Sequence, residues 1–252
     1  MRLAIDAGNS RVKWGWYEPG PQAAGDPPPV HWSSVATVSL IEFAATSDHI
    51  NPFSATHENP DRILISNVAG DGAHQLLVNW LSIFEAEPQW LKGEAERCGV
   101  RNRYQRPEQL GPDRWAALIA ARALAPRRAC LVVNAGTATT VDALSAEGEF
   151  LGGLILPGVD LMRFVLHEHT GRLPLQQGSF VATPRNTIDA IESGCRHAQA
   201  GAVERMYRVL DDECLCVISG GGGEALIERL DGMPCRYVEN LVLEGLARIG
   251  SP

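Results

Sequence analysis

The first informative feature of the chain is a short apolar segment near the N-terminus that runs into a polar turn. Residues 3–5 are apolar, and residues 6–10 read Asp-Ala-Gly-Asn-Ser. Val12, Trp14 and Trp16 then alternate with polar or small residues until the chain turns again. Alternation with a period of two is typical of a strand with one buried face. The pattern therefore predicts a strand, a tight turn and a second strand.

The same pattern recurs in the second half of the chain. Apolar residues 131–133 run into Asn134-Ala-Gly-Thr137, and a second apolar stretch leads to a turn at residues 146–149. A later pair of elements also repeats. The pattern predicts one strand at residues 62–68 and another at residues 215–219. Each is followed by glycine and then by apolar residues at helical spacing. The two halves therefore look like copies of one unit.

Two longer helices are expected, one at residues 113–124 and one at residues 187–210. Pro126 is expected to end the first of them. Residues 19–29 are rich in Pro and Gly and predict a surface loop. Strands followed by helices in each half indicate an α/β protein. The duplication predicts two similar domains facing across a cleft, residues 1–115 and residues 116–252.

Composition excludes several classes of function. A net charge of −8 and a pI near 5.4 argue against nucleic acid as a partner, because phosphate contacts need clustered Lys and Arg. No apolar run reaches the roughly 18 residues of a membrane span, and the N-terminus does not resemble a signal peptide. We therefore expect a cytoplasmic protein. Its six cysteines show no C-x-x-C spacing and are expected to be reduced thiols.

The candidate chemistry begins at the first turn. Asp6 follows an apolar strand, so its carboxylate can hold Mg²⁺, while Gly8, Asn9 and Ser10 offer donors to phosphate oxygens and Lys13 adds positive charge. A plain β-turn that closes a hairpin is the alternative. The second copy of the turn favours a phosphate site, because two such hairpins suit a nucleotide held by duplicated domains. The glycine run at residues 220–223 also allows close approach of the backbone to a ligand.

Asp113 and Arg114 stand where an apolar helix begins. Asp113 is either the N-cap of that helix, accepting from the N–H groups of Trp115 and Ala116, or the acceptor of a proton from a substrate hydroxyl. In the second interpretation Arg114 binds a substrate carboxylate with two parallel hydrogen bonds. The pair His167 and His169 is interpreted as surface residues, because positions i and i+2 of a helix point apart.

Together these segments resemble the ordered motifs of type III pantothenate kinases, the Bvg accessory factor homologues, over nearly the whole chain. The motifs are residues 6–10 (DAGNS), 111–114 (GPDR), 134–142 (NAGTATTVD), 152–158 (GGLILPG) and 186–187 (NT). The resemblance implies an actin-like ATPase fold of duplicated ribonuclease-H-like domains, with mixed sheets flanked by helices, and a homodimer. It also implies transfer of the γ-phosphoryl group of ATP to the hydroxyl of pantothenate, the first step of coenzyme A synthesis.

The resemblance assigns roles to particular residues. Asp113 would be the proton acceptor, and Asp6 would hold Mg²⁺ or another divalent cation, directly or through water. The ATP phosphates would be bound by Asp6, Ala7, Gly8, Asn9, Ser10, Arg11, Val12, Lys13 and Thr137. Pantothenate would be bound by Tyr104, Gly111, Pro112, Asp113, Arg114 and Thr187.

Two positions depart from the family pattern. Ser10 replaces the usual Thr and keeps the hydroxyl, whereas Asn134 replaces an acidic residue that helps to hold a monovalent cation, K⁺ or NH₄⁺, in many members. The loss of charge at Asn134 puts potassium dependence in question. Two other functions remain possible from the sequence. One is a kinase of the same superfamily that acts on a sugar or acyl acid, and the other is a regulatory protein that keeps the nucleotide fold without useful catalytic activity.

Overall fold

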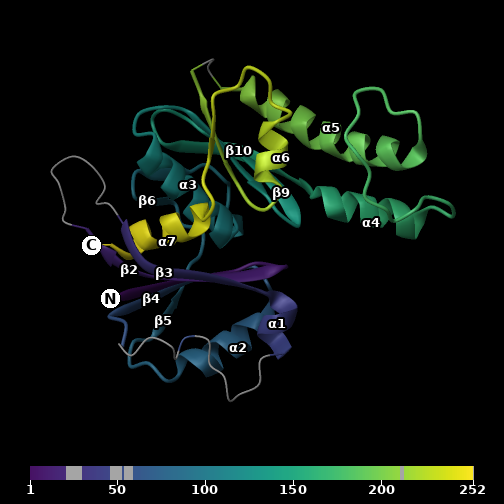
Figure 1. Cartoon of the computed structure of the whole chain (residues 1–252). Coiled ribbons are helices and arrows are strands. Elements are labelled where there is room, and N and C mark those ends of the chain that lie inside the picture. The colour runs from purple at the N-terminus through teal and green to yellow at the C-terminus, as the bar shows by residue number, and fades with distance from the viewer. Residues whose placement is uncertain (21–29, 46–52, 54–58, 211–212, 252) are drawn as a thin grey trace. The chain divides into compact units, whose positions relative to one another are not determined.

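The computed structural model describes residues 1–20, 30–45, 53, 59–210 and 213–251. The chain forms two compact units, one of Met1–Leu124 with Asn240–Pro252 and one of Ala125–Glu239 (Figure 1). The boundary that the sequence predicts near Trp115 falls inside helix α3 (Pro112–Leu124). Most of the loop expected at residues 19–29 lies outside the described residues.

The first unit contains a five-stranded sheet in the order β3-β2-β1-β4-β5. Strand β1 is antiparallel to β2 and parallel to β4, which confirms the predicted strand, turn and strand. The bounds are β1 (Arg2–Ala7), β2 (Arg11–Pro19), β3 (Val30–Ser39), β4 (Arg62–Asn67) and β5 (Pro88–Trp90). A short hairpin of β6 (Glu96–Arg97) and β7 (Val100–Asn102) and a 3-10 turn at Pro107–Gln109 precede α3.

The two faces of this sheet have different partners. Leu3, Ile5 and Ile65 pack against Phe43 and Trp80, which come from α1 (Leu40–Ala45) and α2 (Asp71–Leu81). Helices α3 and α7 (Leu241–Gly250) pack on the opposite face of the sheet (Figure 1). Because side chains alternate along a strand, the residues that flank this apolar row on β1 and β4 point toward α3 and α7.

Helices α3 and α7 approach each other closely. A Cβ atom at Gly245 would overlap the backbone of Ala116, so only glycine allows this crossing. The carbonyl oxygen of Gly250, at the end of α7, accepts hydrogen bonds from Arg2 and Arg62 at 2.8 and 3.0 Å. The C-terminal helix is thereby fixed to β1, which leads into the first polar turn, and to the neighbouring β4.

The second unit repeats the strand order of the first. Its strands β10-β9-β8-β11-β12 correspond in order to β3-β2-β1-β4-β5, with β8 antiparallel to β9 and parallel to β11. The bounds are β8 (Cys130–Ala135), β9 (Ala138–Leu144), β10 (Glu149–Pro157), β11 (Leu215–Ser219) and β12 (Cys235–Tyr237). The duplication inferred from the sequence, and the mixed sheets flanked by helices, are confirmed.

The helices of the second unit are α4 (Val159–His169), α5 (Thr187–Tyr207) and the short α6 (Gly223–Ile227). Helix α5 packs on the sheet through Ala200 and Val203, and it ends three residues before the predicted end at residue 210. Helix α7 was not predicted from the sequence, and of α4 only the part around His167 and His169 was expected to be helical. Within the described ranges, no helix combines the length and the apolar character that crossing a membrane requires.

Candidate active site

The first polar turn is a tight connection between β1 and β2. The Gly8 N–H donates to the Arg11 carbonyl at 2.9 Å, which leaves Asn9, Ser10 and Arg11 exposed at the tip. Asp6 lies opposite Lys13 in the register of the two strands. The Lys13 ammonium donates to Asn240 Oδ1 at 3.2 Å, and Asn240 is the residue before α7. Both charges are thus placed at the base of an exposed hairpin.

Asp6 is electrostatically unusual. Burial and, after it, the neighbouring Asp113 raise the pKa of its carboxyl to about 7, although Ser66 and Lys13 act in the opposite direction. The residue as a whole is half-buried, but its Oδ1 atom is shielded from solvent and has no hydrogen-bond partner among the described residues. Lys13 and Ser66 therefore offset the effects of burial and of Asp113 only in part.

A hard divalent cation fits this arrangement. Mg²⁺ takes oxygen ligands, and it is commonly held by one or two carboxylates with waters and substrate phosphates. Asp6 supplies an unpartnered carboxylate oxygen, and Asp113 adds a second negative charge nearby. In the part of the chain that the structure describes, no group of three or more His, Cys, Asp or Glu could hold a metal ion alone.

Asp113 lies in the first turn of α3, because the helix starts at Pro112 and the Trp115 N–H donates to the Gly111 carbonyl. The alternative in which Asp113 is the N-cap for Trp115 is therefore wrong. Its carboxylate accepts instead from the Arg114 N–H at 2.8 Å. Burial raises the pKa of the Asp113 carboxyl, and the Arg114 backbone and guanidinium partly offset this effect.

Tyr104 and Arg114 form a pair beside Asp113. Arg114 is buried, with 5% of the residue exposed. Its guanidinium donates to the Tyr104 hydroxyl at 3.2 Å and lies 5.8 Å from the centre of the Tyr104 ring. Asn102 holds the loop that carries the tyrosine, since its Oδ1 accepts from Tyr104 N–H at 3.0 Å and its amide donates to Pro107 at 3.1 Å. The sequence analysis did not identify Asn102.

The corresponding turn of the second unit joins β8 to β9. Thr137 is exposed at its tip, and its carbonyl accepts from the Gly158 N–H at 2.8 Å. Asn134 is the last but one residue of β8 and lies beside the glycine run that follows β11. Gly220 has φ +93°, and a Cβ atom there would lie 2.8 Å from Asn134 Oδ1. Only glycine therefore suits both the backbone and the contact at this position.

Thr187 is the first residue of α5 and follows its N-cap, Asn186, whose Oδ1 accepts from the Asp189 N–H at 2.9 Å. It lines a cavity of about 1000 Å³ between α4 and α5. The lining is mostly apolar: Pro157, Met162, Val165, Leu166, Leu173, Pro184, Arg185, Asn186, Thr187, Ala190, Ile191, Gly194, Cys195 and Ala198. His167 and His169 are exposed on α4, in agreement with their interpretation as surface residues.

The structure therefore places Asp6, Lys13, Tyr104, Asp113 and Arg114 in the first unit, where several of them contact or electrostatically influence one another. Thr137, Asn134 and Thr187 belong to the second unit. Ser66, Asn102 and Asn240 touch or adjoin the predicted site residues of the first unit but were not found from the sequence.

Comparison with known proteins identifies close relatives. The family model of type III pantothenate kinase matches residues 2–209. A type III pantothenate kinase of Aromatoleum aromaticum is 50% identical over 249 residues, which cover 98% of this chain and 96% of the relative. One of Nitrosospira multiformis is 43% identical, covering 99% of this chain and 90% of the relative.

Solved structures show the same fold at low sequence identity. A conserved putative Baf family transcriptional activator from Campylobacter jejuni has a TM-score of 0.63 at 22% identity, covering 98% of this chain and 96% of that one. A putative 2-dehydro-3-deoxygalactonokinase from Sinorhizobium meliloti has a TM-score of 0.63 at 15% identity, covering 99% and 98%. The duplicated α/β units are thus those of the actin-like kinase fold.

Proposed function

We propose catalytic and binding roles for individual residues of this chain. The chain belongs to the family of type III pantothenate kinases. Enzymes of this family transfer the γ-phosphoryl group of ATP to the hydroxyl of pantothenate and give 4'-phosphopantothenate, the first step of coenzyme A synthesis. Kinases with this fold use a divalent metal ion with the nucleotide.

The observation that carries the proposal is the proximity of two acidic side chains, Asp6 and Asp113, in one unit. Asp113 raises the pKa of Asp6, and burial raises the pKa of both. Two carboxylates in different surroundings suit two different tasks. Asp6 would hold Mg²⁺, which neutralises charge on the phosphates, and Asp113 would accept the proton of the pantothenate hydroxyl.

The phosphates of ATP would be held by the exposed tip of the first hairpin. Gly8, Asn9, Ser10 and Arg11 present backbone N–H groups and polar side chains there, and Lys13 adds positive charge at its base. Asn240 keeps the Lys13 ammonium beside the strand rather than free in solvent. Thr137, exposed at the tip of the second hairpin, would contribute a further hydroxyl to ATP.

Pantothenate carries a carboxylate, an amide and two hydroxyls. Arg114 would bind the carboxylate through paired hydrogen bonds, and the Tyr104 hydroxyl, already 3.2 Å from the guanidinium, holds Arg114 in place. Gly111 and Pro112 would shape the loop before α3. Thr187 is the polar residue at the start of α5 that would contact the substrate, since it lines the apolar cavity of the second unit.

Asn134 would occupy the position at which other family members bind a monovalent cation. Its amide oxygen lies beside Gly220 and brings no charge. We propose that K⁺ or NH₄⁺ is bound weakly, because an amide oxygen attracts a hard cation less than a carboxylate does.

Helix α4 and strand β10 carry exposed apolar side chains that a second copy of the chain could cover. Helix α4 has no buried residue among those described, although it carries Leu161, Phe164 and Val165 at 36–48% exposure. On β10, Leu154 and Ile155 are 39% and 66% exposed. Exposed apolar side chains are frequent at protein interfaces, so we propose a homodimer that covers these residues. Phe164→Asp should convert the dimer to monomer in sedimentation experiments.

The test of the proposed function is a coupled assay of ADP release with ATP, Mg²⁺ and a panel of acceptors. ADP should form rapidly with pantothenate and only slowly without it, and mass spectrometry should detect 4'-phosphopantothenate. Sugars and acyl acids serve as control acceptors. Turnover that is equal for a sugar acid, or no turnover with pantothenate, would overturn the assignment.

A further inference from the structure

Ser66 occupies the position on β4 that is directly in register with Asp6 on β1. Paired residues of neighbouring parallel strands point to the same face of the sheet, so the serine hydroxyl and the carboxylate share the face covered by α3 and α7. The hydroxyl is close enough to act on the Asp6 carboxyl. In this structure, however, the two groups do not meet the geometry of a full hydrogen bond.

The Ser66 side chain is unusual because it is buried without a partner. The residue is 0% exposed, and within the described part of the chain its Oγ atom accepts or donates no hydrogen bond. A buried hydroxyl without a partner costs about 1–3 kcal/mol. The neighbouring Leu64 and Ile65 are apolar, and an alanine would avoid this cost. An unsatisfied polar group in a native core requires an explanation.

The duplicated unit offers an internal comparison. Ser219 ends β11 and is in register with Asn134, as Ser66 is in register with Asp6. The Ser219 hydroxyl donates to the Glu239 carbonyl at 3.3 Å. The serine beside the neutral Asn134 therefore has a backbone partner, whereas the serine beside the acidic Asp6 has none. The unsatisfied hydroxyl and the unsatisfied Asp6 Oδ1 occur together.

We propose that Ser66 is a positioning residue for the metal–nucleotide complex: its hydroxyl donates a hydrogen bond to the Asp6 carboxylate when a divalent cation is bound. This inference rests on the proposed role of Asp6 in metal binding. Hydrogen bonds to metal-ligating carboxylates orient the ligand, and their loss typically weakens metal binding about 10-fold to 100-fold.

The test measures cation binding rather than turnover. Mn²⁺ is titrated into the whole protein in the presence of ADP, and free Mn²⁺ is followed by electron paramagnetic resonance. Ser66→Ala should raise the dissociation constant of Mn²⁺ by about tenfold. Ser66→Cys, which keeps a weak S–H donor in nearly the same volume, should fall between Ala and the natural residue.

Stability is measured in parallel by tryptophan fluorescence, because all six tryptophans lie in the first unit. Ser66→Ala removes an unsatisfied hydroxyl, so the melting temperature should stay equal or rise. Ser82→Ala is the matched control in the same unit, since the Ser82 hydroxyl donates to Asn79 at 2.7 Å on the surface. This control should leave Mn²⁺ binding unchanged.

Three outcomes separate the inference from the proposed function. Weaker Mn²⁺ binding in both Asp6→Asn and Ser66→Ala supports both. If Asp6→Asn loses Mn²⁺ binding while Ser66→Ala binds within twofold of the natural protein, the role of Ser66 is refuted and that of Asp6 stands. If Asp6→Asn binds Mn²⁺ normally, the metal assignment itself fails, and the inference fails with it.

Discussion

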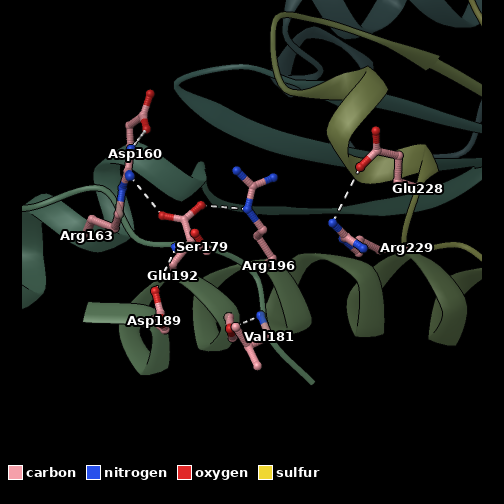
Figure 2. A network of polar contacts seen from close by, with 10 residues as sticks. Asp160, Arg163, Ser179, Val181, Asp189, Glu192, Arg196, Glu228 and Arg229 are labelled. Atoms are coloured by element: carbon pink, nitrogen blue, oxygen red, sulfur yellow. Dashed lines mark hydrogen bonds and ion pairs between the residues drawn. The ribbon is translucent and has the colours of Figure 1, made fainter. Parts of the chain in front are cut away.

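The Arg163 guanidinium donates to the Glu192 carboxylate at 2.8 Å and thereby links α4 to α5. Glu192 is 1% exposed and also accepts from Arg196 Nε at 2.6 Å, while Arg163 has a second ion pair with the exposed Asp160 (Figure 2). The two arginines flank one buried carboxylate. The network joins the two helices, α4 and α5, that supply most of the residues lining the apolar cavity.

Glu192→Gln should therefore destabilise the second unit and weaken pantothenate binding. Removing one partner of a buried ion pair costs about 3–5 kcal/mol, because the remaining charges lose their compensation. Asp160→Asn is the control, since its exposed carboxylate should contribute about 1 kcal/mol or less. Urea unfolding followed by circular dichroism, together with the KM values for both substrates, checks the result. Equal losses in the two variants would contradict the importance of the buried carboxylate.

Asp113→Asn should lower kcat at least about 100-fold while leaving the fold and ATP binding largely intact. The amide keeps the shape and can still accept from the Arg114 N–H, but it cannot take the proton of the hydroxyl. Steady-state assays and nucleotide titrations measure the two effects. Near-normal turnover would show that Asp113 has only a structural role.

Arg114→Lys should raise the KM for pantothenate roughly tenfold or more and change the KM for ATP little. An ammonium group cannot form the two parallel hydrogen bonds of a guanidinium, and it also loses the contact with the Tyr104 hydroxyl. Tyr104→Phe serves as the control for that second effect. Similar losses for both substrates would mean that Arg114 does not act at the pantothenate carboxylate.

Asn134→Asp should create or strengthen a dependence on potassium, because a carboxylate holds a hard cation better than an amide oxygen does. Mg²⁺ should stay essential in both forms. Initial rates are compared against potassium concentration, with ionic strength kept constant by a bulky organic cation. A steep potassium requirement in the natural protein would show that other oxygen atoms hold the cation.

Tyr17→Phe should protect the first unit against alkaline unfolding. Burial raises the pKa of the Tyr17 hydroxyl to about 12 from the ordinary value of 10.0. The folded state therefore holds this proton more tightly than the unfolded state, and stability is lost as pH rises from about 10 to 12. The loss amounts to at most about 3 kcal/mol, and the phenylalanine variant should not show it.

Near pH 8 the same substitution should be neutral or slightly stabilising. The Tyr17 hydroxyl is buried without a hydrogen-bond partner among the described residues, so its removal leaves nothing unpaired. Tyr207→Phe is the control in the second unit, because the Tyr207 hydroxyl donates to the Cys214 carbonyl at 3.2 Å and its loss should cost about 1 kcal/mol. Urea unfolding by tryptophan fluorescence reports the first unit, and circular dichroism reports both units, so a change seen only by circular dichroism belongs to the second. A Tyr17→Phe variant that loses stability at pH 8 would contradict the absence of a partner.

Local sequence was sufficient for the elements with strong periodicity. The helix at residues 113–124 is found within one residue of the predicted bounds, and the hairpin around Asp6 is found with β1 extending two residues past the predicted end at residue 5. Helix α7 was missed although it is apolar, since its short pattern follows strand β12 without a capping side chain. For α4 only the segment around His167 and His169 was expected to be helical, and its start was not predicted because Gly158, the residue before it, has no capping side chain.

The sequence by itself determined the duplicated α/β plan, the family and the residue types available for phosphoryl transfer, because turn chemistry and hydrophobic period are properties of neighbouring residues. Only the tertiary structure decided which residues meet. Ser66 faces Asp6 because β4 lies parallel to β1 in that register, and Asn240 reaches Lys13 because the C-terminal helix returns to the first unit. Glu192 likewise acquires two arginine partners only when α4 folds onto α5. Such contacts depend on strand register and helix packing, and both are set by burial across the whole unit rather than by any local pattern.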